Sequence, residues 1–123
     1  MTRDELVRRL VVNEISDDFE NIDQVILRRV AETGIKCGLT IERSEVVAAL
    51  ESLIADGLAT AHILPEPGEV PGMPPVNEIE ENFKTYFHIT KKGMAVHLSD
   101  DTWCPLDDEE NLRPDWRLSA SDA

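Results

Sequence analysis

The feature that most constrains the fold is a helix-to-strand passage that has a strand-to-helix counterpart further along the chain. Residues 41–64 read IERSEVVAALESLIADGLATAHIL, with apolar residues at helical spacing that stop at Gly57 and continue as an alternating strand. Residues 86–97, YFHITKKGMAVH, predict a strand and then a short helix capped by Thr90. The two strands suit an antiparallel hairpin, so we expect a helix, a hairpin and a closing helix.

A first helix is expected near the start of the sequence. Thr2 suits its N-cap, with Glu5 as the capping-box partner. Its apolar residues recur at helical spacing and should form the buried stripe: Leu6, Val7, Leu10, Val11 and Ile15. Val12 extends the apolar surface beyond one stripe, which indicates burial on two sides, within the domain or in a homodimer.

A second helix is expected to start at Asn21, with Gln24 as its capping-box partner, and to end at Gly34 in a left-handed C-terminal cap. Thr40 is the expected N-cap of the third helix. This leaves a seven-residue link, 34–40, which is longer than the turn of about 3–4 residues in a helix-turn-helix.

Two segments differ in composition from these elements. Residues 65–84 hold five prolines, two glycines and five glutamates, so we expect a long loop between the two strands. Residues 99–123 hold eight acidic and two basic residues, which predicts an acidic tail that packs partly on the domain. We therefore expect one domain over 1–98, mainly α with a small β-hairpin (an α+β fold), and a tail over 99–123.

The chain of 123 residues has no apolar stretch of the roughly 18–20 residues that a membrane span needs. Its first residues, MTRDELVRRL, carry charges at once, which argues against a secretion signal. Cys37 and Cys104 are far apart and in no metal-binding spacing, so we expect free thiols. A cytoplasmic protein without membrane contact is the expectation.

No pattern for catalysis or cofactor binding stands out. His62 and His88 fall on the two predicted strands and are candidates to face each other across the hairpin, but no zinc-ligand spacing accompanies them. No serine or cysteine lies in a nucleophile motif, and no glycine-rich loop suits a phosphate. We expect no metal, no cofactor and no enzymatic activity.

The stretch SEVVAALESLIADGLATA resembles the third helix and first wing strand of bacterial winged helix-turn-helix regulators. The stretch YFHITKKG resembles the strand-to-helix step after the wing in the MarR-like and PadR-like groups, through Tyr86, Ile89, Thr90 and Gly93. The resemblance covers residues 3–98. It implies a winged-helix domain with three helices, a two-stranded wing and a closing helix, whose third helix would enter the major groove of DNA.

Charge argues against that use. Affinity for DNA rests largely on lysine and arginine, whereas this chain has a formal net charge of −13. The candidate DNA contacts are Arg43, Lys36 and Lys84. Around them the expected third helix and wing are mainly acidic. Four arginines form either one basic patch or, as we favour, ion pairs with the many carboxylates: Arg8, Arg9, Arg28 and Arg29.

The function that fits best is a regulatory or scaffolding module that acts through protein–protein contact, with a protein partner or a second copy of itself. Candidate interaction residues are Trp103 and Trp116 in the tail and Met73 in the loop. One alternative is a dimeric DNA-binding transcriptional regulator. Another is an acidic inhibitor or DNA mimic that binds a basic protein.

Overall fold

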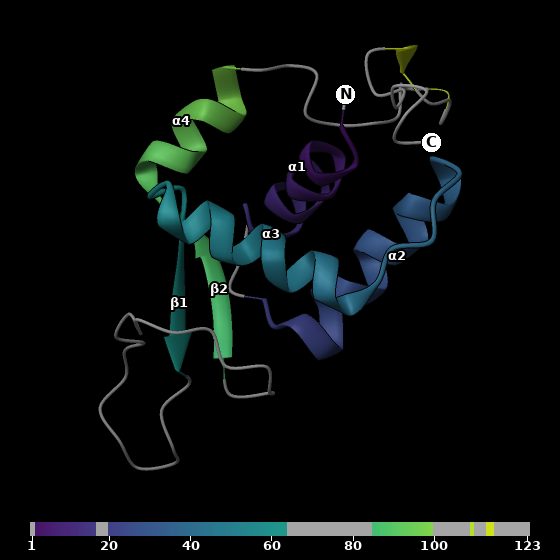
Figure 1. The fold of residues 1–123 in the computed structure, drawn as a ribbon. Helices are drawn as coiled ribbons and strands as arrows, with labels where there is room; N and C mark the ends of the chain where they lie inside the picture. The colour runs from purple at the N-terminus through teal and green to yellow at the C-terminus, as the bar shows by residue number, and fades with distance from the viewer. Residues whose placement is uncertain (1, 17–19, 64–84, 100–108, 110–112, 115–123) are drawn as a thin grey trace.

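The computed structural model describes residues 2–16, 20–63, 85–99, 109 and 113–114 (Figure 1). Its elements follow in this order: α1 (Arg3–Ile15), the π-helical turn η1 (Ile22–Ile26), α2 (Leu27–Lys36), α3 (Arg43–Ala55), β1 (Ala59–Ile63), β2 (Thr85–Ile89) and α4 (Lys91–Ser99). The predicted α+β class, mainly helical with a small antiparallel hairpin, is confirmed. Within these described ranges, no helix is both long and apolar enough to cross a membrane.

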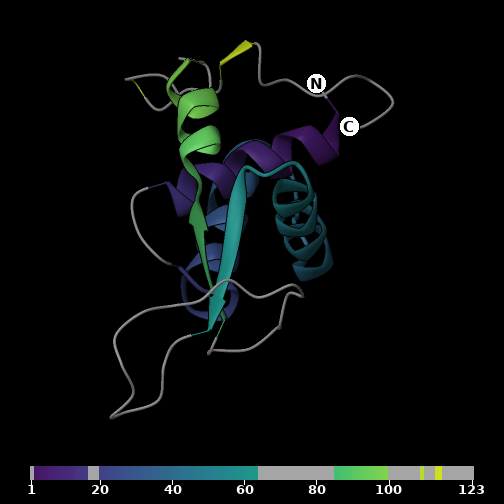
Figure 2. The same ribbon diagram turned by 90° about the vertical axis from the view of Figure 1, so that its left-hand side faces the viewer.

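Helix α1 lies at the centre of the packing. The Thr2 hydroxyl oxygen accepts a hydrogen bond from the Glu5 backbone N–H at 3.2 Å, as expected for an N-cap. The predicted stripe is buried, and Val12 is buried with it. Burial on two sides is explained within the chain, because α1 packs against α3, α2 and β2 together (Figure 2).

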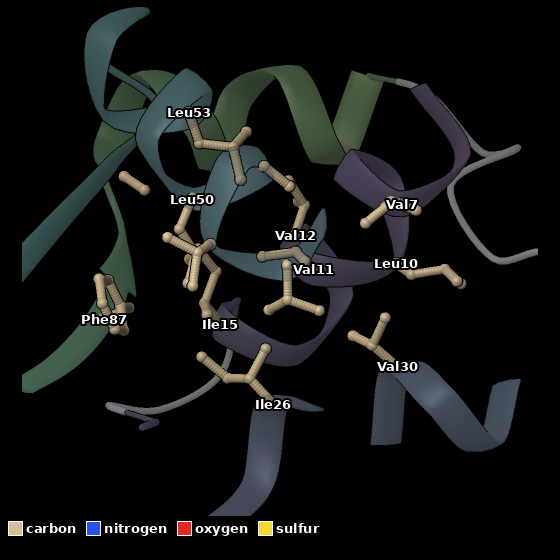
Figure 3. Close-up of a cluster of buried hydrophobic side chains, with 14 of the residues drawn as sticks. Val7, Leu10, Val11, Val12, Ile15, Ile26, Val30, Leu50, Leu53 and Phe87 are labelled. Carbon is tan, nitrogen blue, oxygen red and sulfur yellow. The ribbon is translucent and has the colours of Figure 1, made fainter. Parts of the chain in front are cut away.

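The core is aliphatic with one large aromatic side chain (Figure 3). Phe87 on β2 is fully buried and lies on the same side of the core as Ile15 and Leu50. Ile26 from η1 and Val30 from α2 are also buried and lie at the lower edge of the cluster in Figure 3. A core of this kind holds three helices against one face of a hairpin.

The second helical stretch starts directly after Asn21, the predicted capping residue, but its first turn and its C-terminal end differ from the prediction. It starts at Ile22 with a π-helical turn, in which the Asn21 carbonyl accepts from the Ile26 N–H at 3.0 Å. It ends at Lys36, so Gly34 is not its left-handed cap. Gly34 lies inside the helix, and a Cβ placed there would lie 2.5 Å from Ile41 Cδ1. Glycine at position 34 therefore lets the Ile41 side chain lie close to the helix. The residue with the positive φ is Gly38 instead, at 81°.

Helix α3 begins at Arg43, so the expectation of Thr40 as its N-cap is wrong. Glu42 occupies the cap position without a side-chain cap bond. The segment before it is held by burial, because Leu39 and Ile41 both point into the core at 8% and 6% exposure. Alternate burial of this kind requires extended chain, which delays the start of the helix.

The hairpin follows as predicted. Gly57 ends α3 with φ of 74°, a conformation that glycine adopts without steric cost. β1 and β2 pair antiparallel with Ala61 opposite Phe87. Alternate residues of β2, Thr85, Phe87 and Ile89, face the core. The hairpin therefore has one buried, mainly apolar face against the helices.

The structure contains one isolated β-bridge that the sequence did not predict. Glu20, between α1 and η1, forms a β-bridge with Phe87: the Glu20 N–H donates to the Phe87 carbonyl at 3.0 Å, and the Phe87 N–H donates to the Glu20 carbonyl at 2.8 Å. The bridge lies on the edge of β2 away from β1. It anchors the connection between α1 and η1 to the sheet.

Thr90 links α4 to the end of α3. Its hydroxyl oxygen accepts from the Gly93 N–H at 3.0 Å, and the same hydroxyl donates to the Gly57 carbonyl at 2.7 Å. Lys92 adds a hydrogen bond from Nζ to the Asp56 carbonyl at 2.9 Å. The predicted cap is confirmed, and Thr90 and Lys92 also hydrogen-bond the carbonyls of the two residues that follow α3.

Replacing Thr90 with valine, which keeps the shape but removes the hydroxyl, is expected to lower the free energy of unfolding by about 1–2 kcal/mol. The loss comes from the cap bond and from the bond to the Gly57 carbonyl. Chemical denaturation followed by circular dichroism measures it. Thr33→Val on α2 is the control, expected to change stability by less than about 0.5 kcal/mol; equal losses for both variants would contradict the role of Thr90.

Candidate functional site

Helix α3 is the element that a DNA-reading function would use, so its solvent-facing side is the first candidate site. We call this side the α3 outer face. It comprises five exposed residues: Ser44, Ala48, Glu51, Ser52 and Ala55. The face carries small side chains, one carboxylate and no base. It offers nothing that neutralises phosphate.

Arg43, one of the candidate DNA contacts, is held at the edge of this face. Its Nη2 donates to Asp23 Oδ1 at 3.0 Å and Oδ2 at 3.1 Å, and its Nε donates to Oδ1 at 3.2 Å. Asp23 belongs to η1, so the pair ties α3 to the helical stretch that packs beside it. The two-pronged geometry is the favourable one for guanidinium and carboxylate. Contact with a guanine would require this pair to break.

Two arginines of α1 reach across to α3 and bind carboxylates there. Arg3 Nη2 lies 3.1 Å from Glu45 Oε1, and the same guanidinium donates to the Thr40 carbonyl. Arg8 Nη1 lies 2.7 Å from Asp56 Oδ2 and donates to Ser52 Oγ at 2.7 Å. Glu45 also lies in the first turn of α3, where a negative charge suits the helix dipole. Both positive charges are therefore compensated within the chain.

Of the four arginines for which the sequence allowed either a basic patch or ion pairs, three form ion pairs. Arg9 Nη2 lies 3.2 Å from Glu5 Oε1 within α1, and Arg29 Nη1 lies 3.7 Å from Glu14 Oε2. Arg28 is exposed on α2. Such surface pairs contribute about 0–1 kcal/mol each to stability, so their main effect is on local charge.

A hollow of about 540 Å³ opens between α1 and α3. Six of the residues that line it set its character: Asp4, Glu5 and Arg8 from α1, and Glu45, Ala48 and Ser52 from α3. We call it the α1–α3 hollow. Its volume falls in the range of roughly 300–1,000 Å³ typical of ligand sites, and Val7 and Ala49 add apolar surface to the lining. The hollow therefore combines charged side chains with small and apolar ones.

The other predicted site residues are not brought to this place. Lys36 is exposed at the end of α2. Lys84, Met73, Trp103 and Trp116 lie outside the described residues.

Exposed apolar side chains lie elsewhere on the described surface. Val96 and Leu98 on α4 are 40% and 75% exposed, and Ile35 at the end of α2 is 70% exposed. Val96 and Leu98 are two positions apart, which places them on different sides of the helix. They do not make one continuous apolar stripe.

The sequence allowed His62 and His88 to face each other across the hairpin. In the structure they are not directly opposite each other. The register places His62 across from Tyr86 and His88 across from Thr60. His62 Nε2 lies 2.6 Å from Thr60 Oγ1. In the part of the chain that the structure describes, no group of three or more histidine, cysteine or acidic residues is arranged to hold a metal ion.

Cys37 is a free, half-buried thiol packed against the core cluster. Burial raises the pKa of the Cys37 thiol above its ordinary value. The thiol is therefore protonated at neutral pH, which is the unreactive form.

Comparisons of this chain with protein-family models, curated proteins and solved structures found no match.

Proposed function

We propose that this chain is a small acidic winged-helix module that acts as a regulator or scaffold by binding protein. The fold part of the proposal is supported by the order of elements. Three helical segments are followed by a hairpin and a closing helix, as the resemblance implies. The Glu20–Phe87 bridge supports it further, because it fixes the helices to one edge of the hairpin.

The observation that carries the functional part is the charge state of the α3 outer face. Within the described ranges, the three arginines that flank it, Arg3, Arg8 and Arg43, are each bound to a carboxylate. The face itself carries Glu51 and no base. Phosphate contacts supply most of the affinity of DNA-binding proteins, and this surface repels phosphate. A protein surface with complementary charge is the partner that it favours.

The alternative, a dimeric DNA-binding regulator, rests on Arg43 and on the order of the elements. Breaking the Arg43–Asp23 pair would free one guanidinium, but Asp23 would then add an uncompensated negative charge beside the DNA. The second alternative, an acidic inhibitor or DNA mimic, is favoured by the formal charge of −13. It shares with our proposal a basic protein as the partner.

A titration of duplex DNA fragments with the full chain separates these functions. We expect no saturable binding at about 50 mM salt or at about 200 mM salt, because low salt gives phosphate contacts their largest contribution. Fluorescence anisotropy of labelled duplex measures it. Arg43→Ala and Arg28→Ala remove the same charge, the first at α3 and the second on the exposed side of α2. Salt-sensitive binding that Arg43→Ala weakens more than Arg28→Ala would establish the DNA-binding alternative.

A further inference from the structure

The α1–α3 hollow has small side chains on its α3 side. Its α3 side includes Ala48 and Ser52, whose side chains end at or near Cβ, and Ser52 Oγ accepts a hydrogen bond from Arg8. Both residues are exposed. Small side chains at this spacing leave a groove along a helix into which larger side chains of a second helix fit. The walls are the outer side chains of α1.

The charge around the hollow is negative after the internal ion pairs are formed. Glu45 and Glu5 are paired with Arg3 and Arg9, and Arg8 is paired with Asp56. Asp4 on the wall and Glu51 on the adjoining outer face are both exposed, and neither forms an ion pair with another described residue. These two carboxylates are left to interact with an incoming positive charge.

This charge selects among possible occupants. A second copy of the chain carries the same formal charge of −13, so it is repelled at long range. Nucleic acid is repelled for the same reason. A positively charged helix is attracted, and its long lysine or arginine side chains can reach the rim carboxylates while their aliphatic stems cover the small side chains of the floor.

We propose that the α1–α3 hollow binds a basic amphipathic helix of a partner protein. This proposal rests on the proposed protein-binding function and names the surface and the partner class. The helix lies along α3 over Ala48 and Ser52, and its cationic side chains meet Asp4 and Glu51. The internal Arg8–Asp56 and Arg3–Glu45 pairs hold the walls in place, so the groove exists before the partner arrives.

The test uses the full chain and a synthetic peptide of about 18 residues, long enough to form a helix in water. The peptide has lysines on one face and alanines and leucines on the other. Its titration into ¹⁵N-labelled protein is expected to shift the amide signals of Arg8, Ala48 and Ser52 most. Shifts spread evenly over all helices, or centred on α4, would overturn the proposal.

A steric variant tests the floor. Ala48→Trp fills the hollow from an exposed position and is expected to weaken peptide binding at least about tenfold. Ala95→Trp, at an exposed position of α4 outside the hollow, is the matched control and is expected to leave binding unchanged. Thermal melts show that both variants are folded. Equal affinity of the two variants would contradict binding in the hollow.

A charge variant tests the rim without filling space. Glu51→Lys and Glu32→Lys change the net charge equally, but Glu32 lies on the exposed side of α2. We expect Glu51→Lys to weaken binding several-fold more than Glu32→Lys, because a nearby charge acts more strongly than a distant, screened one. Equal weakening would show general attraction to an acidic protein and would overturn the site. DNA binding in the earlier titration would instead contradict the proposed function, so the two failures are distinguishable.

Discussion

Replacing Phe87 with alanine is expected to lower the free energy of unfolding by about 3–5 kcal/mol, the range for a fully buried phenylalanine. Phe87 is the largest fully buried side chain among the described residues, and it fills the space between the hairpin and the helices. Its loss removes buried apolar surface and leaves a cavity that the surrounding helices fill only in part. For a domain with a typical total stability of about 5–15 kcal/mol, this is a large share.

Urea denaturation of the wild type and the variant measures the effect. Tyr86→Ala is the matched control, because Tyr86 is the neighbouring aromatic residue on the opposite, half-exposed face of β2. We expect it to cost at most about 1–1.5 kcal/mol, since less surface is buried and little cavity forms. A larger loss for Tyr86→Ala than for Phe87→Ala would contradict the assignment of the two faces of the strand.

Replacing Gly93 with alanine is expected to destabilise the protein by about 1–3 kcal/mol, the cost of overpacking a tight contact. A Cβ at this position would lie 2.2 Å from the Leu58 carbonyl oxygen and 2.7 Å from Ile89 Cγ1. The Leu58 carbonyl cannot move freely, because it accepts the Thr90 N–H at 3.0 Å. At a solvent-exposed helix position the same change would stabilise the protein by about 1 kcal/mol. The sign of the measured change therefore shows whether Gly93 packs against Leu58 and Ile89.

Two measurements separate this packing effect from a general loss of stability. Denaturation gives the sign and the size, and hydrogen exchange should show faster exchange in α4 with the α1 amides still protected. Ala95→Gly on the exposed side of α4 is the control, with an expected loss of about 0.5–1 kcal/mol from helix propensity alone. Stabilisation by Gly93→Ala would mean that α4 does not pack on the end of α3.

Features set by neighbouring residues along the chain were predictable. The Thr2 cap, the buried stripe of α1, the left-handed Gly57 and the Thr90 cap each depend on a few adjacent side chains and backbone groups. The antiparallel hairpin was predictable because both strand segments alternate apolar and polar residues and can bury the same face. In each case local preference and tertiary packing favour the same conformation.

Features set by distant contacts were not predictable. Gly34 and Gly38 are both glycines near a helix end, and only the position of Ile41 against Gly34 shows which one serves as the left-handed residue. Thr40 has the chemistry of a cap, but the burial of Leu39 and Ile41 prevails over that preference. The Glu20–Phe87 bridge uses backbone groups alone, so no side-chain pattern announces it.

The candidate site shows the same division. The acidic character of α3 and the position of Arg43 could be read from the sequence, and ion pairing of the arginines was the favoured interpretation. The partners themselves lie on other elements: Asp23 on η1 binds Arg43, and Glu45 on α3 binds Arg3. The α1–α3 hollow was missed, because it depends on how α1 crosses α3 and on which small residues face outward.

The bridge between Glu20 and Phe87 has a consequence for how the chain tolerates insertions. It fixes the position of β2 from its outer edge, and the buried face of the strand fixes its register against β1. The alignment of the two strands is therefore fixed by described residues outside the segment that joins them. For a flexible insertion between residues 63 and 85, loop closure costs about 0.6 kcal/mol for each doubling of loop length. That connection is the natural place to insert an epitope, a fluorescent reporter or a whole second domain without disturbing the helices.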